Sequence, residues 1–209
     1  MDAYNTQQRI EAYLTETAKR DSSAIAISTI THSVWRNITY SQLIQQANAM
    51  CAELQKHNIT SGERVILLSR NSIEAVAALI GIWLAKASAV LVDPDLPESE
   101  IAAQIKTADS RLMINQSGEI KILDHQSKTI FKDTDELIAA LLFTSGTTSN
   151  AKAVMLSHSN FIYLMQAYQQ KKLGKAGDCV LTILPLFHVA GLFCSVIEPL
   201  FLGFNIIFF

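Results

Sequence analysis

The sequence predicts an α/β fold in which a mainly parallel sheet carries helices on both faces. Segments with helical and with strand patterning alternate along the chain from about residue 41. Residues 89–92 are apolar at every position, which is typical of a parallel strand that helices cover on both sides. The 209 residues are 49% hydrophobic and 17% charged, a composition that suits a packed core and excludes long disorder.

Each expected element follows from local signals. Ser41 is placed to cap the first helix, Asn71 and Glu74 stand in capping-box register at the second, and Pro97 suits the first turn of the third. Helices are expected at residues 41–58, 71–84, 97–108, 160–170 and 192–202. Strands are expected at residues 65–68, 89–92, 111–114, 120–123, 141–143, 154–156, 180–184 and 205–209. This βα alternation predicts a doubly wound sheet.

Charge and hydropathy exclude several classes of protein. Seventeen Lys and Arg against nineteen Asp and Glu give a formal net charge of −2, with no basic patch for nucleic acid or a membrane surface. Two apolar stretches, residues 76–92 and 180–209, are interrupted by polar residues, Pro and Gly, so we expect no transmembrane segment. The N-terminus lacks the pattern of a secretory signal. Three cysteines without metal-ligand spacing, Cys51, Cys179 and Cys194, indicate reduced thiols and a cytoplasmic protein.

A hydroxyl-rich segment, Thr144-Ser-Gly-Thr-Thr-Ser-Asn-Ala-Lys152, follows a predicted buried strand. Such a loop can wrap its N–H groups around an anion, its hydroxyls add hydrogen bonds, and the Lys adds a positive charge. An ordinary polar turn is the alternative for a segment of this composition. A Walker A motif is excluded because Ala151 and Ala153 stand where that motif needs Gly and a hydroxyl.

Four ordered segments resemble the AMP-forming acyl-CoA synthetases and related adenylate-forming ligases. Residues 142–154, followed by Ser157-His-Ser-Asn160, resemble the signature TSGTTGxPKGV…SHxN. Residues 38–43 and 83–97 are similar to two upstream motifs, and residues 184–192, Leu-Pro-Leu-Phe-His-Val-Ala-Gly-Leu, to the substrate-pocket motif. The resemblance covers the chain from about residue 10.

The resemblance implies a domain organisation. Residues 1–209 correspond to an incomplete N-terminal, AMP-binding domain, and the family's C-terminal domain, with its catalytic Lys, has no counterpart here. Residues 1–135 are interpreted as a first α/β subdomain, and residues 136–209 as the start of a second that contains the phosphate loop. The last expected strand ends at the last residue, so we expect one apolar face to be left bare.

The resemblance also implies the reaction. A carboxylate attacks the α-phosphorus of ATP to give acyl-AMP and pyrophosphate, and CoA then displaces AMP, with Mg²⁺ offsetting phosphate charge. The nucleotide-binding residues implied by the motif are Thr144, Ser145, Gly146, Thr147, Thr148 and Lys152. Three motif positions depart from the family, Ser149, Ala151 and Ala153, and a Cβ at each is expected to strain the ATP-bound loop. The fragment by itself is expected to be inactive.

His188 is the candidate that bears on the substrate. A lone His in an apolar stretch is often a core residue, whereas the resemblance places it beside the substrate carboxylate, where amino-acid-activating relatives carry Asp. A fatty or aromatic acid without an α-amino group is therefore favoured. Val189 and Gly191 are expected to line the acyl pocket, although packing explains them equally well. His158 is interpreted as a structural hydrogen-bonding residue, and no metal ligand is identified.

Two alternatives stay open at this stage. One lies within the family: an o-succinylbenzoate–CoA ligase or an enzyme that loads a carrier protein. The other is a non-catalytic module that binds an acyl group or a nucleotide, or that docks to a partner. Small-molecule acid, ATP, CoA and the missing C-terminal part are the expected partners, with no nucleic acid.

Overall fold

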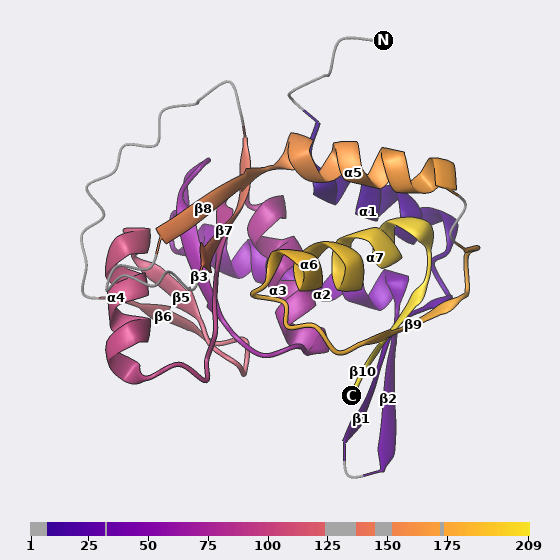
Figure 1. Cartoon of the computed structure of the whole chain (residues 1–209), viewed down its shortest axis with the longest axis horizontal. Coiled ribbons are helices and arrows are strands. Elements are labelled where there is room, and N and C mark those ends of the chain that lie inside the picture. The colour runs from indigo at the N-terminus through magenta and orange to yellow at the C-terminus, as the bar shows by residue number, and fades with distance from the viewer. Residues whose placement is uncertain (1–7, 32, 124–136, 145–151, 172–173) are drawn as a thin grey trace.

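Two β-sheets, and not one, carry the mainly parallel α/β fold (Figure 1). The computed structural model describes residues 8–31, 33–123, 137–144, 152–171 and 174–209. A six-stranded sheet has the order β6 (Ile120–Ile122), β5 (Leu112–Ile114), β3 (Arg64–Leu68), β4 (Ser88–Val92), β7 (Ile138–Thr144), β8 (Lys152–Ser157). Its four inner strands are parallel, and β6 and β8 pair antiparallel at the two edges.

The four-stranded sheet joins the start of the chain to its end. Its order is β2 (Val34–Thr39), β1 (Ile25–Thr31), β10 (Asn205–Phe208), β9 (Cys179–Thr182). β10 lies parallel to both β1 and β9, while β1 and β2 form an antiparallel hairpin. The six-stranded sheet is the predicted doubly wound one, whereas β9 and β10 lie outside it and pair with a hairpin that the apolar periodicity did not predict.

The sheet boundary does not coincide with the expected division at residue 135. β7 pairs with β4 in the six-stranded sheet, and Leu91 of β4 lies opposite Leu142 of β7. β9 and β10, which follow in the chain, belong to the other sheet. Hydrogen-bonded pairing therefore groups β3 to β8 together, across residues 124–136.

Helices cover both faces of the six-stranded sheet, as expected. The helices are α1 (Ile10–Arg20), α2 (Tyr40–Lys56), α3 (Ile73–Leu84), α4 (Glu98–Ala108), α5 (His158–Lys171), α6 (Val189–Leu192) and α7 (Glu198–Leu202). A π-helical turn, Phe193–Ile197, joins α6 to α7. α4 packs on one face against Ile66, Val90 and Leu141, and none of the described helices is long and apolar enough to cross a membrane.

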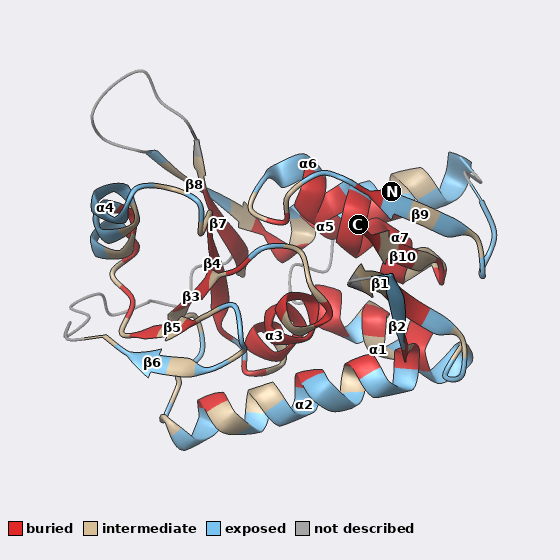
Figure 2. Ribbon diagram, turned by 90° about the horizontal axis from the view of Figure 1, so that it is seen from below, coloured by how far each residue is buried: buried red, intermediate tan, exposed pale blue. Residues whose placement is uncertain are grey.

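The main core lies between the two sheets (Figure 2). Alternate β3 side chains, Val65 and Leu67, face this core together with the wholly buried Trp83 of α3. From the other sheet, Ile27 and Ile206 point into the same cluster. Burial on both sides of β3 and β4 explains why these strands read as unbroken apolar runs.

The opposite face of the four-stranded sheet remains apolar and accessible in the part of the chain that the structure describes. Strand alternation and register place Trp35 of β2 and Leu181 of β9 on this face, and they are 55% and 61% exposed. Ile207 of β10, between them in register, is half-buried.

Two predicted helix caps were wrong by one or two positions. Thr39, not Ser41, caps α2: its hydroxyl accepts from the backbone of Gln42, whose side chain accepts from the Thr39 N–H. Ser72, not Asn71, caps α3 by accepting from the Ala75 N–H at 3.0 Å. In both places the hydroxyl nearest the first turn satisfies an orphan amide, and the side chain of Asn71 is left for other partners.

Candidate active site

The carboxyl ends of four parallel strands meet at one edge of the six-stranded sheet. Leu68 of β3 lies opposite Val92 of β4, and Leu91 of β4 lies opposite Leu142 of β7. In open α/β sheets, ligands bind in the crevice outside this edge. The residues that follow β3, β4, β5 and β7 are therefore the first to consider.

The hydroxyl-rich segment begins at this edge. Thr144 ends β7 and Lys152 begins β8, and the two are cross-strand partners in an antiparallel pair. The loop that they bracket, residues 145–151, lies outside the described residues and includes the expected binding residues Ser145, Gly146, Thr147 and Thr148. Lys152 is exposed. The structure thus fixes the two ends of a hairpin at the carboxyl edge.

One of the three departures from the family motif lies in a regular strand. Ala153 lies within β8 opposite Phe143, and its backbone is not among those with positive φ. Its methyl group packs against the apolar cluster under α4. An extended strand accepts a Cβ at this position, and strain in the ATP-bound loop stays a prediction. Ser149 and Ala151 lie outside the described residues.

Polar residues after β3, β4 and β5 are linked to one another. Arg70, which follows β3, forms an ion pair with Asp95, which follows β4. Gln116, which follows β5, accepts from the Arg70 N–H at 2.6 Å and from the Ser69 hydroxyl at 3.1 Å. The sequence analysis missed these residues, although each follows a buried strand, which was the available signal. Their contacts tie the three connections into one polar rim.

Asn71 connects this rim to the segment that precedes His188. Its Nδ2 donates to the carbonyl of Leu184 at 2.9 Å, and its Oδ1 accepts from the N–H of Leu186 at 2.7 Å. The segment leaves β9 in the four-stranded sheet, so one carboxamide joins the two sheets at their carboxyl edges. Sequence periodicity alone does not reveal such a contact over more than one hundred residues.

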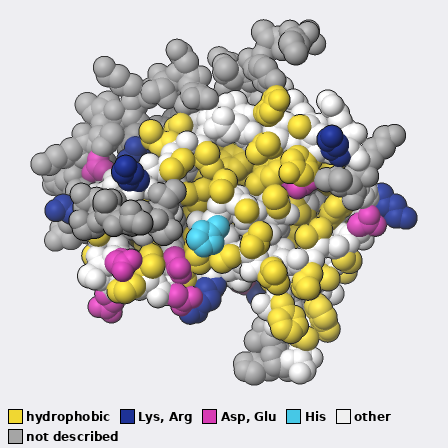
Figure 3. Space-filling view, in the orientation of Figure 1, with side chains coloured by type: hydrophobic (Ala, Val, Ile, Leu, Met, Phe, Trp, Pro, Cys, Tyr) yellow, Lys and Arg dark blue, Asp and Glu magenta, His cyan; other side chains and the backbone are white. Residues whose placement is uncertain are grey.

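The three expected substrate residues lie close together in the chain but differ in exposure. His188 precedes α6, is exposed, and lies edge-on to the ring of Phe187 with centroids 5.1 Å apart. Val189 is 53% exposed. Gly191 is buried, and a Cβ there would lie 1.9 Å from the carbonyl oxygen of Pro185. His188 and Val189 are accessible to a ligand, whereas Gly191 permits the close approach of α6 to the preceding segment. Hydrophobic side chains gather on the face that Figure 3 shows, over α6 and α7.

The π-helical turn after α6 brings a thiol and a carboxyl group together. Glu198 is 8% exposed, and burial raises its pKa. Cys194, one turn earlier, has its pKa raised by burial first and by the charge of Glu198 second. π-turns within helices are often found at functional sites. Here the turn places these two groups in the segment that begins with His188.

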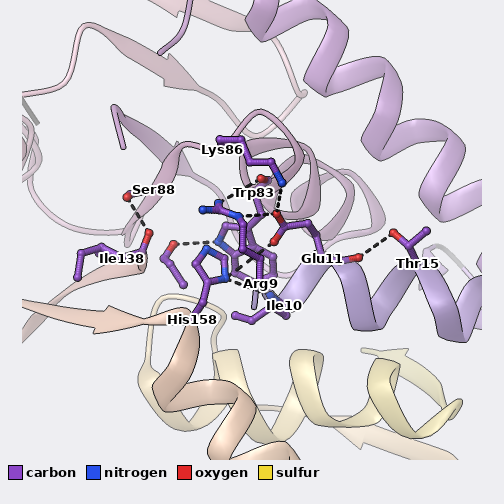
Figure 4. Close-up of polar contacts among 10 residues, drawn as sticks. Arg9, Ile10, Glu11, Thr15, Trp83, Lys86, Ser88, Ile138 and His158 are labelled. Atoms are coloured by element: carbon purple, nitrogen blue, oxygen red, sulfur yellow. Dashed lines mark hydrogen bonds and ion pairs between the residues drawn. The ribbon is translucent and has the colours of Figure 1, made fainter. Parts of the chain in front are cut away.

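His158 lies at the opposite end of the β7–β8 hairpin, inside the core (Figure 4). It is wholly buried, and its Nδ1 accepts from the Ile10 N–H at the start of α1, at 3.2 Å. Burial first, and then the charges of Arg9 and Lys86, lower the pKa of His158 to about 2. Glu11 accepts from Arg9 at 2.6 Å and pairs with Lys86 at 3.1 Å. The structural role predicted for His158 is confirmed.

The described residues contain no group of three or more His, Cys, Asp or Glu that could hold a metal ion. An Mg²⁺ ion that arrives with a triphosphate does not need such a cage, because Mg²⁺ usually keeps waters and is held by phosphates and one or two carboxylates. Asp93 and Asp95 follow β4 at the same sheet edge as the hairpin that Thr144 and Lys152 bracket.

Comparison with known proteins identifies the family. A family model described as AMP-binding enzyme matches residues 14–209. The chain belongs to the AMP-binding enzyme family. The family resemblance of the four motifs is thereby confirmed, and with it the assignment to the adenylate-forming ligases.

Several relatives in this family are much longer than the chain, which spans about a third or less of their length. It is 30% identical over 177 residues to the 2-succinylbenzoate–CoA ligase of Bacillus subtilis, covering 75% of this chain and 36% of the ligase. It is 29% identical over 182 residues to Surfactin synthase subunit 1 of the same organism, covering 76% of this chain and 5% of the synthase. Both kinds of enzyme thus match about three quarters of the chain.

Solved structures confirm the fold of this AMP-binding enzyme. The N-terminal domain of FACL13 from Mycobacterium tuberculosis superposes with a TM-score of 0.81 at 22% identity, over 97% of this chain and 57% of that chain. The fatty acid AMP ligase from Legionella pneumophila gives a TM-score of 0.81 at 22% identity, over 100% of this chain and 41% of that chain. The predicted class, an N-terminal domain of the adenylate-forming fold, is confirmed.

Proposed function

We propose that this chain carries the nucleotide- and acid-binding part of a ligase that activates a carboxylic acid with ATP and transfers the acyl group to CoA. The observation that carries the proposal is that the hairpin after β7 and the segment before His188 both lie at the carboxyl edge of the six-stranded sheet. The hairpin between Thr144 and Lys152, named the phosphate hairpin from here on, begins at the carboxyl end of β7. Asn71, beyond the carboxyl end of β3 at the same sheet edge, holds the segment that leads to His188. Family membership supports ATP as the activating nucleotide.

The hairpin is proposed to hold the β- and γ-phosphates. Backbone amides of residues 145–148, the hydroxyls of Thr144 to Thr148 and the ammonium of Lys152 would bind the leaving pyrophosphate and orient it in line with the attacking carboxylate. Mg²⁺, when bound, supplies positive charge to the same phosphates. The work of these residues is therefore positioning and charge neutralisation, with no acid–base pair needed from this part of the chain.

The acid is proposed to be fatty or aromatic and to lack an α-amino group. His188 is exposed at the start of α6, and the accessible side chain beside it is the apolar Val189. Neither residue offers a carboxylate to pair an α-ammonium group. An acid that carries only its carboxylate and an apolar body suits these side chains.

A second candidate within the family is supported by the relatives. Surfactin synthase subunit 1 and the 2-succinylbenzoate–CoA ligase of Bacillus subtilis each match about three quarters of the chain, at similar identity. The acceptor is then the thiol of a carrier protein rather than of CoA. The acceptor choice can be read from product analysis, and it does not alter the adenylation step.

The test is acid-dependent exchange of pyrophosphate into ATP, measured with the full-length protein. We expect exchange with fatty or aromatic acids and little with the twenty amino acids. The His188→Asp variant should lose exchange with these acids. Exchange with amino acids alone would overturn the proposed substrate class, and ATP binding without exchange for any acid would identify a non-catalytic nucleotide-binding module.

Lys152 gives a separate test of the nucleotide half of the proposal. Lys152→Ala should raise KM for ATP about 10- to 100-fold, because it removes a charge from the phosphate site. The acid KM should change much less. Lys171→Ala, at the exposed end of α5, is the matched control and should leave both constants unchanged. An unchanged KM for ATP in Lys152→Ala would contradict the assigned role.

A further inference from the structure

We propose that Asn71 is a positioning residue that sets the place of His188 relative to the phosphate hairpin. The inference rests on the proposed function, because it assigns a purpose to a contact between the two halves of that site. Asn71 is three residues beyond the end of β3, and its carboxamide reaches a segment that follows β9. No contact between Asn71 and the ligand is required.

The first step is that Asn71 and the phosphate hairpin lie at the same carboxyl edge of the six-stranded sheet. β3 pairs with β4, and β4 pairs with β7, whose last residue is Thr144. Ser72 caps α3, so the Asn71 side chain is not used for the helix start. The Arg70–Asp95 ion pair and the Gln116 contact hold the backbone next to Asn71. The carboxamide of Asn71 is therefore held in a fixed position relative to the six-stranded sheet.

The second step is that both polar groups of the carboxamide are used on one segment. Nδ2 donates to Leu184 O and Oδ1 accepts from Leu186 N–H, so the two hydrogen bonds bracket Pro185. This arrangement fixes the position of the segment and also its rotation about the chain axis. An aspartate in this place would keep the acceptor for Leu186 but would set an oxygen against the carbonyl of Leu184.

The third step leads from Pro185 to His188. The Pro185 carbonyl accepts from the His188 N–H at 3.1 Å, and the same oxygen lies where a Cβ of residue 191 would be, 1.9 Å away. Gly191 thus lets α6 pack directly on the segment that Asn71 holds. The His188 carbonyl in turn accepts from Leu192 N–H at 2.8 Å. The two side-chain hydrogen bonds of Asn71 and two backbone hydrogen bonds thus connect Asn71 to His188 and to α6.

The consequence concerns the relation between the two sheets. β9 belongs to the four-stranded sheet and β3 to the six-stranded sheet. In the proposed reaction a carboxylate near His188 must meet the α-phosphorus of a nucleotide held by the hairpin, and a misplacement of about 1 Å can cost roughly 100-fold in rate. Asn71 follows β3, and its side chain hydrogen-bonds directly to Leu184 and Leu186. It therefore links the six-stranded sheet to the segment that leads to His188.

The first experiment tests the two hydrogen bonds from Asn71 to Leu184 and Leu186, named the clamp from here on, without measuring activity. Amide hydrogen exchange of the protein is followed for the segment of Leu184 to His188 in Asn71→Asp and Asn71→Ala. We expect exchange at Leu186 to accelerate at least about tenfold in Asn71→Ala, because its acceptor is lost, and to change less in Asn71→Asp, which keeps an acceptor for the Leu186 N–H. Asn48→Ala, whose carboxamide bonds only to its own helix α2, is the matched control. Unchanged protection at Leu186 in Asn71→Ala would overturn the clamp.

The second experiment asks whether the clamp acts through His188. In acid-dependent pyrophosphate exchange, Asn71→Asp should lower kcat/KM for the acid about 10- to 100-fold while KM for ATP changes less than about twofold. In a His188→Ala background the same substitution should have an effect of less than about threefold. Equal losses in both backgrounds, or a parallel rise in KM for ATP, would show a merely structural role and overturn the inference.

The two experiments separate the two proposals. If the wild-type protein gives no exchange with any acid, the proposed function fails, and the clamp is then judged by the protection of Leu186 alone. If exchange is present but Asn71→Asp matches the wild type in kcat/KM for the acid, the proposed function stands and the inference fails.

Discussion

Stability below neutral pH should depend on the buried imidazole of His158. The group is wholly buried, accepts from the Ile10 N–H through Nδ1, and has no hydrogen-bond partner at Nε2 among the described residues. Its pKa is lowered from 6.5 to about 2 by burial first, then by Arg9 and Lys86. Between pH 6.5 and about 2, the His158 imidazole is protonated in the unfolded chain and neutral in the folded chain. The free energy of unfolding therefore falls as the pH falls.

The magnitude follows from the distance below 6.5. Each pH unit below the unfolded pKa of 6.5 costs about 1.4 kcal/mol, so lowering the pH from 7 to 5 removes about 2 kcal/mol from the free energy of unfolding. His158→Asn keeps a side-chain acceptor near the Nδ1 position but cannot be protonated. The variant should lose about 2 kcal/mol less than the wild type over this interval, whatever its stability at pH 7.

The assay is urea unfolding at pH 7 and pH 5, monitored by tryptophan fluorescence, because Trp83 lies 6.0 Å from the His158 ring. Comparing two pH values in each protein cancels the pH-independent loss of packing in the variant. His188→Asn, at an exposed position, controls for removal of an imidazole. If His158→Asn and the wild type lost the same free energy between pH 7 and pH 5, the reasoning about a neutral buried imidazole would be refuted.

Two further predictions concern packing and thiol chemistry. Gly81→Ala should lower the free energy of unfolding by about 1–3 kcal/mol, because the new Cβ would lie 2.7 Å from Met50 Cβ where α3 crosses α2, and the gain in helix propensity is smaller than this cost. Urea unfolding measures it, and equal or higher stability would contradict the close approach. Alkylation of Cys194 by iodoacetamide should need a higher pH than a free thiol, and Glu198→Gln should shift its rate profile to lower pH because the second cause of the raised pKa is removed. An unshifted profile would show that Glu198 does not act on the thiol.

Local patterns were sufficient where each element buries a regular apolar set. The strands at Val65 and Ala89 and the helix that contains Val76 were predicted because their apolar residues follow the spacing of fully covered elements. The β1–β2 hairpin was missed because Val34 and Trp35 are apolar but exposed, which obscures the alternation. α1 was missed because it buries Glu11 and Thr17 along with its apolar residues.

Polar residues were harder to assign, because their partners are distant in the chain. Asn71 has the sequence neighbourhood of a helix cap, and Ser72 competes for the same amide only one position later. The carboxamide instead bonds to residues 113 and 115 positions away. For His158 the sequence pointed to a structural hydrogen bond, while its partner, the Ile10 N–H, comes from the other end of the chain.

Sequence patterning determined the class of fold, the order of most helices and strands, and the family, because apolar periodicity and contiguous motifs are local properties of the chain. Tertiary structure alone decided that there are two sheets, that β10 closes onto β1, and that Asn71 joins the β3 edge to the segment before His188. These features depend on pairing between residues far apart in the chain, and many strands with the same apolar pattern could make such pairs equally well.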